Sequence, residues 1–312
     1  MDSVSSTAAQ SQTATNRSIV TFAYLGLLIA IPISGFWRGL VSTDTTTLLL
    51  LQSGVLAILF ALTFAWNAIR SLRGFFVIAV AMSLLPSLVR SIVVESSIGI
   101  SLFGNAGFLI SQTGELISKL ISILGMIGLL LLIGLKRDDF FLVRGDLNAV
   151  TKRTRLFPGM KTDDTWRRAG RNISITVFVL LLTGTLVINL PRLGFDNLIK
   201  ALPLVPLALL FAAVNGIYEE VVFRAAPMSQ LVNTVGSQHA LLITIIYFGM
   251  GHFFGSVPSG VMGVAIASYF AFIMGKAMLE TRGIVWPWVC HFAADSAVFI
   301  FMAVSAVAAG TT

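Results

Sequence analysis

Segments of about 20 predominantly apolar residues recur along this chain, and they restrict its fold more than any other feature of the sequence. An α-helix needs about 20 such residues to cross a bilayer. Hydrophobic residues make up 56% of the 312 residues and charged residues only 11%, compared with roughly a quarter charged in an average soluble domain. The sequence therefore predicts an all-α, polytopic membrane protein.

About nine segments are predicted to be transmembrane helices. Their approximate bounds are 18–37, 45–67, 74–94, 116–135, 173–190, 200–222, 239–255, 260–279 and 286–308. The segment 97–113 is shorter and is interrupted by glycines and Asn105, so we predict an interfacial or re-entrant piece there. Residues 1–17 are polar and are predicted to be a disordered tail. The first span lacks a small-residue cleavage site, so we expect it to be retained and not removed as a signal peptide.

The segment 136–172 is the main hydrophilic loop, and it contains ten of the 21 lysines and arginines. Cytoplasmic loops of membrane proteins collect these residues, so the loop is predicted to be cytoplasmic. We expect the protein in the cell (plasma) membrane. A reporter fused after Leu156 that proved extracytoplasmic would contradict this orientation.

The loop also divides the chain. Residues 18–135 form a predicted N-terminal transmembrane bundle with few polar groups, and residues 173–308 form a predicted core with all three histidines. The net charge of +7 would suggest nucleic-acid binding in a soluble protein. Here cytoplasmic loops account for it, so the expected partners are the lipid bilayer and a membrane-associated protein or peptide, with no nucleic acid.

The stretch Y-E-E-V-V-F-R, residues 218–224, places three ionisable groups directly after an uncharged apolar run. Charges at the bilayer centre cost at least roughly 2.5–3.5 kcal/mol on insertion scales. Glu220 and Arg224 are four apart and can pair on one helix face, which predicts a structural role for both. Glu219 is rotated by about 100° and has no cation partner on its own helix, so it is free to face a cavity. Alternatively, the helix ends at the membrane surface here and both glutamates are solvated.

Two further apolar helices carry ionisable groups that topology does not explain. His252, in Y-F-G-M-G-H-F-F-G, is flanked by glycines near the end of a span. His291 and Asp295 are four apart and share a helix face, so the carboxylate can fix the tautomer of the imidazole. Each group could instead be a hydrogen-bonded packing residue. His239, at a loop-to-helix junction, and Glu280, in the turn M-L-E-T-R-G, have ordinary explanations.

Together these groups fall on three helices and indicate hydrolysis. Glutamate and histidine can activate a water molecule, and histidine with aspartate can stabilise a developing oxyanion. Cys290 beside His291 does not form a thiol dyad, because adjacent helix residues point about 100° apart. Buried carboxylates and histidines also serve transport or proton relay. Against this alternative, the first half of the chain has no matching set, unlike the paired halves of many transporters.

Three motifs in order resemble those of the CPBP family, also called the Abi or type II CAAX prenyl protease family, whose eukaryotic members include the Ras-converting enzyme. The motifs EExxxR, FxxxH and Hxxx(N/D) are matched by Glu219-Glu220-x-x-x-Arg224, Phe248-x-x-x-His252 and His291-x-x-x-Asp295. The resemblance covers about 173–308, and F-F-L-V-R-G-D-L-N-A before it is similar to the pre-core loop of bacterial members.

The resemblance implies a glutamic-type intramembrane endopeptidase. Glu219 and His252 would activate the attacking water, and His291 and Asp295 would occupy the oxyanion positions. Glu220, Arg224 and Phe248 would support the site. Asp295 stands where the eukaryotic enzymes have asparagine, and an ionised aspartate cannot donate to an oxyanion. Asp295 therefore either carries a proton or orients His291.

The same resemblance implies metal-free chemistry, although the family was formerly classed as metalloproteases. No cofactor is expected, since the chain has no H-E-x-x-H pair. The alternative is a zinc ion held by Glu219, His252, His291 and Asp295. Expected substrates are C-terminal sorting tails, peptide pheromone or bacteriocin precursors, or membrane-anchored regulators. A catalytically silent immunity or scaffold protein is a further alternative.

Overall fold

The computed structural model describes residues 17–31, 37–41, 44–104, 107–152, 164–254 and 259–312. Its helical elements are α1 (Arg17–Ala30), α2 (Trp37–Leu40), α3 (Thr45–Ala65), η2 (Asn67–Leu72), α4 (Arg73–Val93), α5 (Ser97–Gly99), η3 (Ile100–Gly104), α6 (Phe108–Leu132), α7 (Trp166–Leu193), α8 (Phe195–Ala201), η4 (Leu202–Leu204), α9 (Val205–Glu220), η5 (Val221–Ala225), α10 (Ala226–Val235), α11 (Ser237–Gly251), α12 (Gly260–Thr281) and α13 (Val285–Ala309). The β-pairing in these ranges is one isolated bridge between Val150 and Thr165. The predicted tail 1–17 lies outside the described residues, except for Arg17, which begins α1.

The all-α membrane fold is confirmed. Over the described residues, seven helical segments are long and apolar enough to cross a membrane: 45–65, 67–93, 108–132, 166–193, 195–235, 260–281 and 285–309. The predicted count of about nine is higher because it includes α1 and α11. These helices contain 14 and 15 residues, fewer than the roughly 20 that span a bilayer.

Two predicted boundaries are wrong. Helix α6 begins at Phe108, so the end of the predicted interfacial segment 97–113 belongs to a long helix. The earlier part of that segment forms α5 and the π-helical η3, and Asn105 lies outside the described residues. Helix α7 begins at Trp166, so the end of the predicted loop 136–172 is helical. Hydropathy detects only the apolar part of a helix, whereas the backbone hydrogen bonds continue into polar residues.

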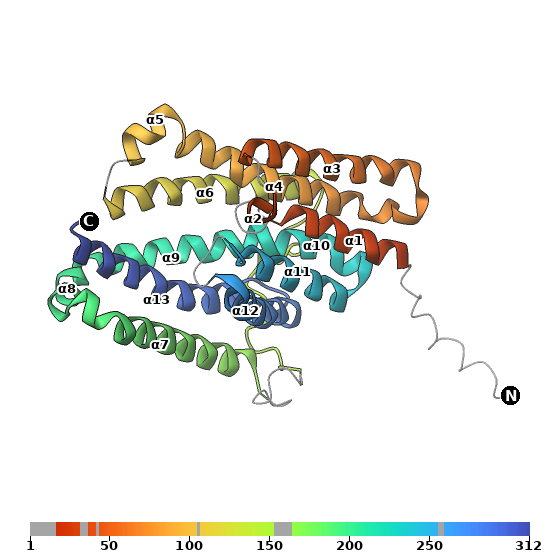
Figure 1. Cartoon of the computed structure of the whole chain (residues 1–312). Coiled ribbons are helices and arrows are strands. Elements are labelled where there is room, and N and C mark those ends of the chain that lie inside the picture. Colours follow the sequence, from red (N-terminus) through yellow and green to blue (C-terminus); the bar gives the residue numbers. More distant parts are fainter. Residues whose placement is uncertain (1–16, 32–36, 42–43, 105–106, 153–163, 255–258) are drawn as a thin grey trace.

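The helices pack in the order α3, α4, α6, α9, α13 and α7 across the molecule (Figure 1). Helix α9, which carries Glu219 and Glu220, therefore lies in the middle and contacts both α6 and α13. The largest buried core joins side chains of α4 and α6, such as Phe75 and Met126, to Val222 of η5 and Met228 of α10. The predicted bundle 18–135 and core 173–308 thus share one hydrophobic core.

The helix that carries Y-E-E-V-V-F-R does not end at a surface. It continues from Val205 to Val235 through the π-helical turn η5. Single π turns inside α-helices are frequent at functional sites. The side chains of Glu220 and Arg224 are 0% and 1% exposed, so the alternative of two solvated glutamates is wrong for Glu220.

The segment after α6 packs on the turn between α12 and α13. Trp166 is fully buried, and its Nε1 donates to Oε2 of Glu280 at 2.8 Å. Glu280 also forms an ion pair with Lys276 one turn earlier. The backbone N–H of Asp146 donates to the carbonyl of Thr281 at 2.8 Å. The interpretation of Glu280 as a turn residue is wrong, because α12 continues to Thr281. The carboxylate of Glu280 instead holds Trp166, at the start of α7, against the end of α12.

Candidate active site

Glu220 is the buried centre of the ionisable cluster. Its Oε1 accepts from Nη1 of Arg224, which is the ion pair that the four-residue spacing predicts. The same oxygen lies 2.8 Å from Nδ1 of His291 on α13. The Arg224 guanidinium also lies over the ring of Phe248, 5.1 Å from its centroid. Glu220 therefore ties α9 to α13 as well as to the following turn.

His291 stands between three carboxylates. Its Nε2 lies 3.3 Å from Oε2 of Glu219 and 3.8 Å from Oδ2 of Asp295. Because Nδ1 is engaged by Glu220, the ring is fixed with Nε2 directed at the other two carboxylates. The side chains of Glu219 and Asp295 are 23% and 16% exposed, compared with 7% for His291. The two partly exposed carboxylates are thus the members of this group that reach open space.

The second motif lies beside this group. His252 follows the last residue of α11, and its ring centroid is 5.2 Å from that of Phe248. Phe248 also makes an edge contact with His291, with ring centroids 5.8 Å apart. We predicted His252 as the imidazole partner of Glu219. The structure gives Glu219 a direct contact with His291, and His252 lines the same cavity as Glu219.

A lysine of the N-terminal bundle completes the cluster. Nζ of Lys119, on α6, donates to Oδ1 of Asn215 at 2.6 Å. Asn215 lies one turn before Glu219 on α9, and its Nδ2 donates to Oε1 of Glu219 at 3.1 Å and to Oδ2 of Asp295 at 2.8 Å. Asn215 therefore holds the two partly exposed carboxylates together, and Lys119 fixes the orientation of the amide.

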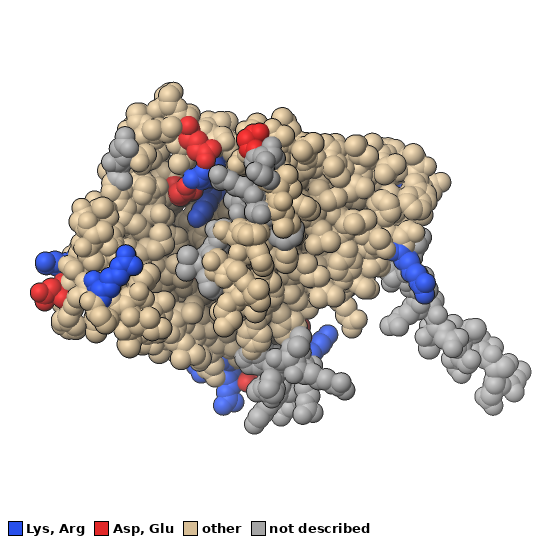
Figure 2. All heavy atoms as spheres, viewed as in Figure 1, with Lys and Arg blue, Asp and Glu red and all other residues tan. Residues whose placement is uncertain are grey.

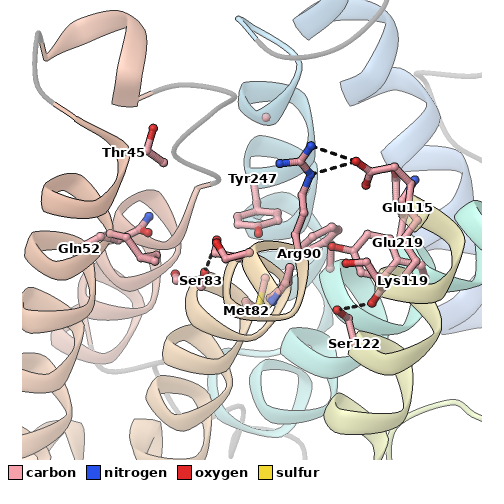
Figure 3. Close-up of a pocket in the computed structure, with 18 of the residues that line it drawn as sticks. Thr45, Gln52, Met82, Ser83, Arg90, Glu115, Lys119, Ser122, Glu219 and Tyr247 are labelled. Carbon is pink, nitrogen blue, oxygen red and sulfur yellow. Dashed lines mark hydrogen bonds and ion pairs between the residues drawn. The ribbon is translucent and has the colours of Figure 1, made fainter. Parts of the chain in front are cut away.

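Glu219 opens into a cavity of about 700 Å³ between the two halves of the protein (Figure 3). In this view Lys119 and Glu219 lie close together on one side of the cavity, and Gln52 and Thr45 stand across it. Helices α3, α4 and α6 and the turn after α4 contribute polar side chains to the walls of the cavity: Thr45, Thr46, Gln52, Ser83, Ser87, Arg90, Ser91, Glu95, Glu115, Ser118, Lys119 and Ser122. The C-terminal half contributes Tyr218, Phe223, Tyr247, Phe248 and His252 beside Glu219.

Charged groups also stand at the exposed side of this cavity. Nη2 of Arg90 lies 3.0 Å from Oε1 of Glu115, and Arg90 forms a second ion pair with Glu95. Figure 2 shows acidic and basic side chains gathered at a hollow on a face that is otherwise almost free of them. A polar cavity that reaches this surface admits water to the buried carboxylates.

Sequence reasoning missed Lys119 because it placed the functional groups in residues 173–308. It missed Asn215 because only ionisable side chains were considered within that range. A signal was present for both. Glu115, Ser118, Lys119 and Ser122 recur at three- and four-residue intervals, which is a polar stripe on one face of an otherwise apolar helix. Asn215 is a polar residue in an otherwise apolar run, one turn before Glu219.

Cys290 has a separate environment. Its Sγ accepts from Oγ of Ser174 on α7 at 3.4 Å, whereas the neighbouring His291 faces Glu220 on α9. This geometry agrees with the prediction that the two residues form no thiol dyad. Within the described ranges, no group of three or more His, Cys, Asp or Glu side chains is arranged to hold a metal ion. The expectation of metal-free chemistry remains a prediction.

The fold and the site define an integral membrane protein with a carboxylate–imidazole cluster inside its helix bundle. Residues 201–297 match the family model described as Rce1-like, type II CAAX prenyl endopeptidase Rce1-like. The match includes all three motifs and confirms the resemblance to the CPBP family over this segment. No curated protein and no solved structure matches the chain.

Proposed function

We propose that this protein is an intramembrane endopeptidase that hydrolyses a peptide bond of a membrane-associated protein or peptide. The observation that carries the proposal is the position of Glu219, a partly exposed carboxylate held by Asn215 and His291 at the wall of a large polar cavity. The family match over residues 201–297 supports the same activity.

Glu219 is the proposed general base. It takes a proton from a water molecule that His252 helps to orient, and the resulting hydroxide forms a bond to the carbonyl carbon of the substrate. When the tetrahedral intermediate collapses, the carbon–nitrogen bond breaks and the proton on Glu219 passes to the leaving amine. Protons and electrons balance in this sequence, and no co-reactant other than water is required.

His291 and Asp295 are the proposed groups at the developing oxyanion. With Nδ1–H donated to Glu220, Nε2 of His291 carries a proton only in the imidazolium form, which the surrounding carboxylates stabilise. That proton can be donated to an oxyanion. Oδ2 of Asp295 already accepts from Asn215 and lies 3.8 Å from His291, which supports the role of orienting the imidazole.

Lys119 and Asn215 are proposed positioning residues. Replacing Lys119 with methionine is expected to lower kcat about 10- to 100-fold, because a charge-assisted hydrogen bond contributes about 1.5–3 kcal/mol. KM should change little, since the base loses its orientation without loss of substrate contacts. Kinetics of purified, reconstituted Lys119→Met and Lys119→Arg would measure this.

The arginine variant keeps the charge and a donor and should recover most of kcat. The matched control is Ser122→Ala, which alters the same cavity-lining face of α6 and should stay within about twofold of wild type. Equal losses of kcat in Lys119→Met and Ser122→Ala, or an effect on KM alone, would contradict a positioning role.

Comparative proteomics of host membranes tests the proposed function directly. Cells that carry wild type or Glu219→Ala at equal protein levels should differ in one or more membrane-associated proteins, which remain uncleaved in the variant. Proteoliposomes with and without an ion gradient provide the second arm. Glu219-dependent ion flux without proteolysis would replace the endopeptidase with a transporter or proton relay, and no difference in either arm would favour an immunity or scaffold role.

For location, we propose the cell (plasma) membrane with the loop 136–172 in the cytoplasm. The charge bias of this segment supports that orientation.

A further inference from the structure

A second cavity, of about 410 Å³, is lined by residues outside the acid–imidazole cluster. It is formed where the segment after α6 meets the first turns of α7 and α13. Its lining consists of Arg144, Leu147, Asn148, Arg167, Arg171 and Trp286. None of these residues contributes to the proposed hydrolytic site.

The floor of this cavity is held in place by specific contacts. Nε1 of Trp286 donates to the carbonyl of Leu147 at 3.1 Å, which joins α13 to the loop. On α7, Gly170 lies so close to Trp286 that a Cβ there would be 2.4 Å from Cε3 of the indole. The tryptophan is therefore fixed between the loop and α7, and the cavity is formed before any ligand binds.

The charge of the lining is strongly positive. Three of its six lining residues are arginines, and none is acidic. Among the residues that the structure describes, Arg144, Arg167 and Arg171 form no ion pair with a carboxylate. Figure 2 shows basic side chains gathered at the edge of the molecule where α7 begins. Arginine binds phosphate oxygens through paired N–H groups, so this lining is suited to a phosphate.

An apolar stripe continues from these arginines along α7. Arg171, Ile175 and Val179 follow one another at four-residue intervals, so consecutive members are neighbours along one side of the helix. Ile175 and Val179 are 57% and 46% exposed. Helix α7 lies at the outer edge of the bundle (Figure 1). Only 6% of the most apolar part of this helix is buried inside the protein. A phosphate held by the arginines would thus have apolar surface directly beside it at membrane depth.

We propose that this cavity binds the phosphate of an anionic glycerophospholipid, with an acyl chain of the same lipid along Ile175 and Val179. The lipid is favoured over a free anion because the basic cavity and the exposed apolar stripe lie on one face of a membrane-spanning helix. Clusters of arginine at the cytoplasmic ends of membrane helices attract the anionic lipids of that leaflet. The proposal does not depend on proteolytic activity.

Lipid binding to the purified full-length protein in neutral detergent tests this proposal. Phosphatidylglycerol and phosphatidylcholine are titrated separately, and bound lipid is counted by native mass spectrometry. Phosphatidylglycerol should bind more tightly than phosphatidylcholine. Arg171→Gln should weaken phosphatidylglycerol binding about fivefold, since each arginine near an anionic lipid surface contributes about 1 kcal/mol.

The matched control is Arg168→Gln, which removes the same charge from an exposed neighbour that does not line the cavity. It should weaken binding less than about twofold, and Arg171→Lys should retain most of the affinity. Equal effects of Arg168→Gln and Arg171→Gln, or equal binding of the two lipids, would overturn the proposal. Displacement of phosphatidylglycerol by excess inorganic phosphate, with no effect of Ile175→Ser/Val179→Ser, would also overturn it, because the site would then recognise a free anion. Thermal unfolding of each variant confirms that it is folded.

Discussion

Replacing Glu219 with glutamine is expected to lower kcat for peptide-bond hydrolysis by roughly 10³-fold, within the range of about 10²–10⁴ that general acid–base catalysis contributes. Glutamine has nearly the same shape, and its side-chain oxygen can still accept the hydrogen bond that Asn215 donates to Glu219. The amide cannot take a proton from water. The loss should therefore appear in kcat, with KM close to that of wild type.

The measurement is steady-state hydrolysis by reconstituted protein, with the substrate found by comparative proteomics. Glu115→Gln is the matched control, because Glu115 is a carboxylate of the same cavity that pairs with Arg90 and not with the acid–imidazole cluster. It should retain activity within a few-fold of wild type. Similar losses in both variants would show that activity depends on the negative charge of the cavity as a whole and not on Glu219 in particular. Activity of Glu219→Gln within tenfold of wild type would exclude Glu219 as the base.

Replacing Arg224 with methionine should destabilise the protein by about 3–5 kcal/mol, the cost of removing one partner from a buried ion pair. Glu220 is 0% exposed, so its charge would remain buried with no cation on its own helix. Thermal and denaturant unfolding in a fixed detergent would measure the change in the free energy of unfolding.

Two variants decide whether the loss comes from the uncompensated charge. Glu220→Gln/Arg224→Met removes both charges while leaving a side-chain oxygen to accept from Nδ1 of His291, so it should be more stable than Arg224→Met alone. Arg90→Met breaks two ion pairs between side chains that are 27% to 51% exposed, and each should cost no more than about 1 kcal/mol. A double variant as unstable as the single variant would point to lost packing around Arg224 and Phe248 instead.

The proposed hydrolytic site contains residues from both halves of the chain. The motifs supply Glu219 from α9, His252 directly after α11, and His291 and Asp295 from α13. Helix α6 supplies Lys119 and part of the polar lining of the cavity. A change in the N-terminal bundle can therefore alter activity without touching any motif residue. For this reason the variants of Lys119 are as informative about the site as those of the motifs.

The sequence by itself determined the membrane class, the helical fold and the neighbours that lie on one helix. Apolar segments of about 20 residues leave few folds other than a helix bundle in lipid, because the backbone must satisfy its own hydrogen bonds there. The four-residue spacings likewise place Glu220 beside Arg224 and Asp295 beside His291, and both contacts are present. These contacts follow from the helical repeat, so no knowledge of packing was needed.

Only the tertiary structure decided which helices meet. Lys119 and Asn215 are 96 positions apart, and Glu220 and His291 are 71 apart, so no local periodicity could pair them. The same limit applies to Trp166, whose indole donates a hydrogen bond to Glu280, 114 positions away. This contact gives Glu280 a structural role that its place in the sequence did not indicate. Contacts of this kind depend on the order in which α6, α9 and α13 pack, and that order is set by side-chain fit over the whole bundle.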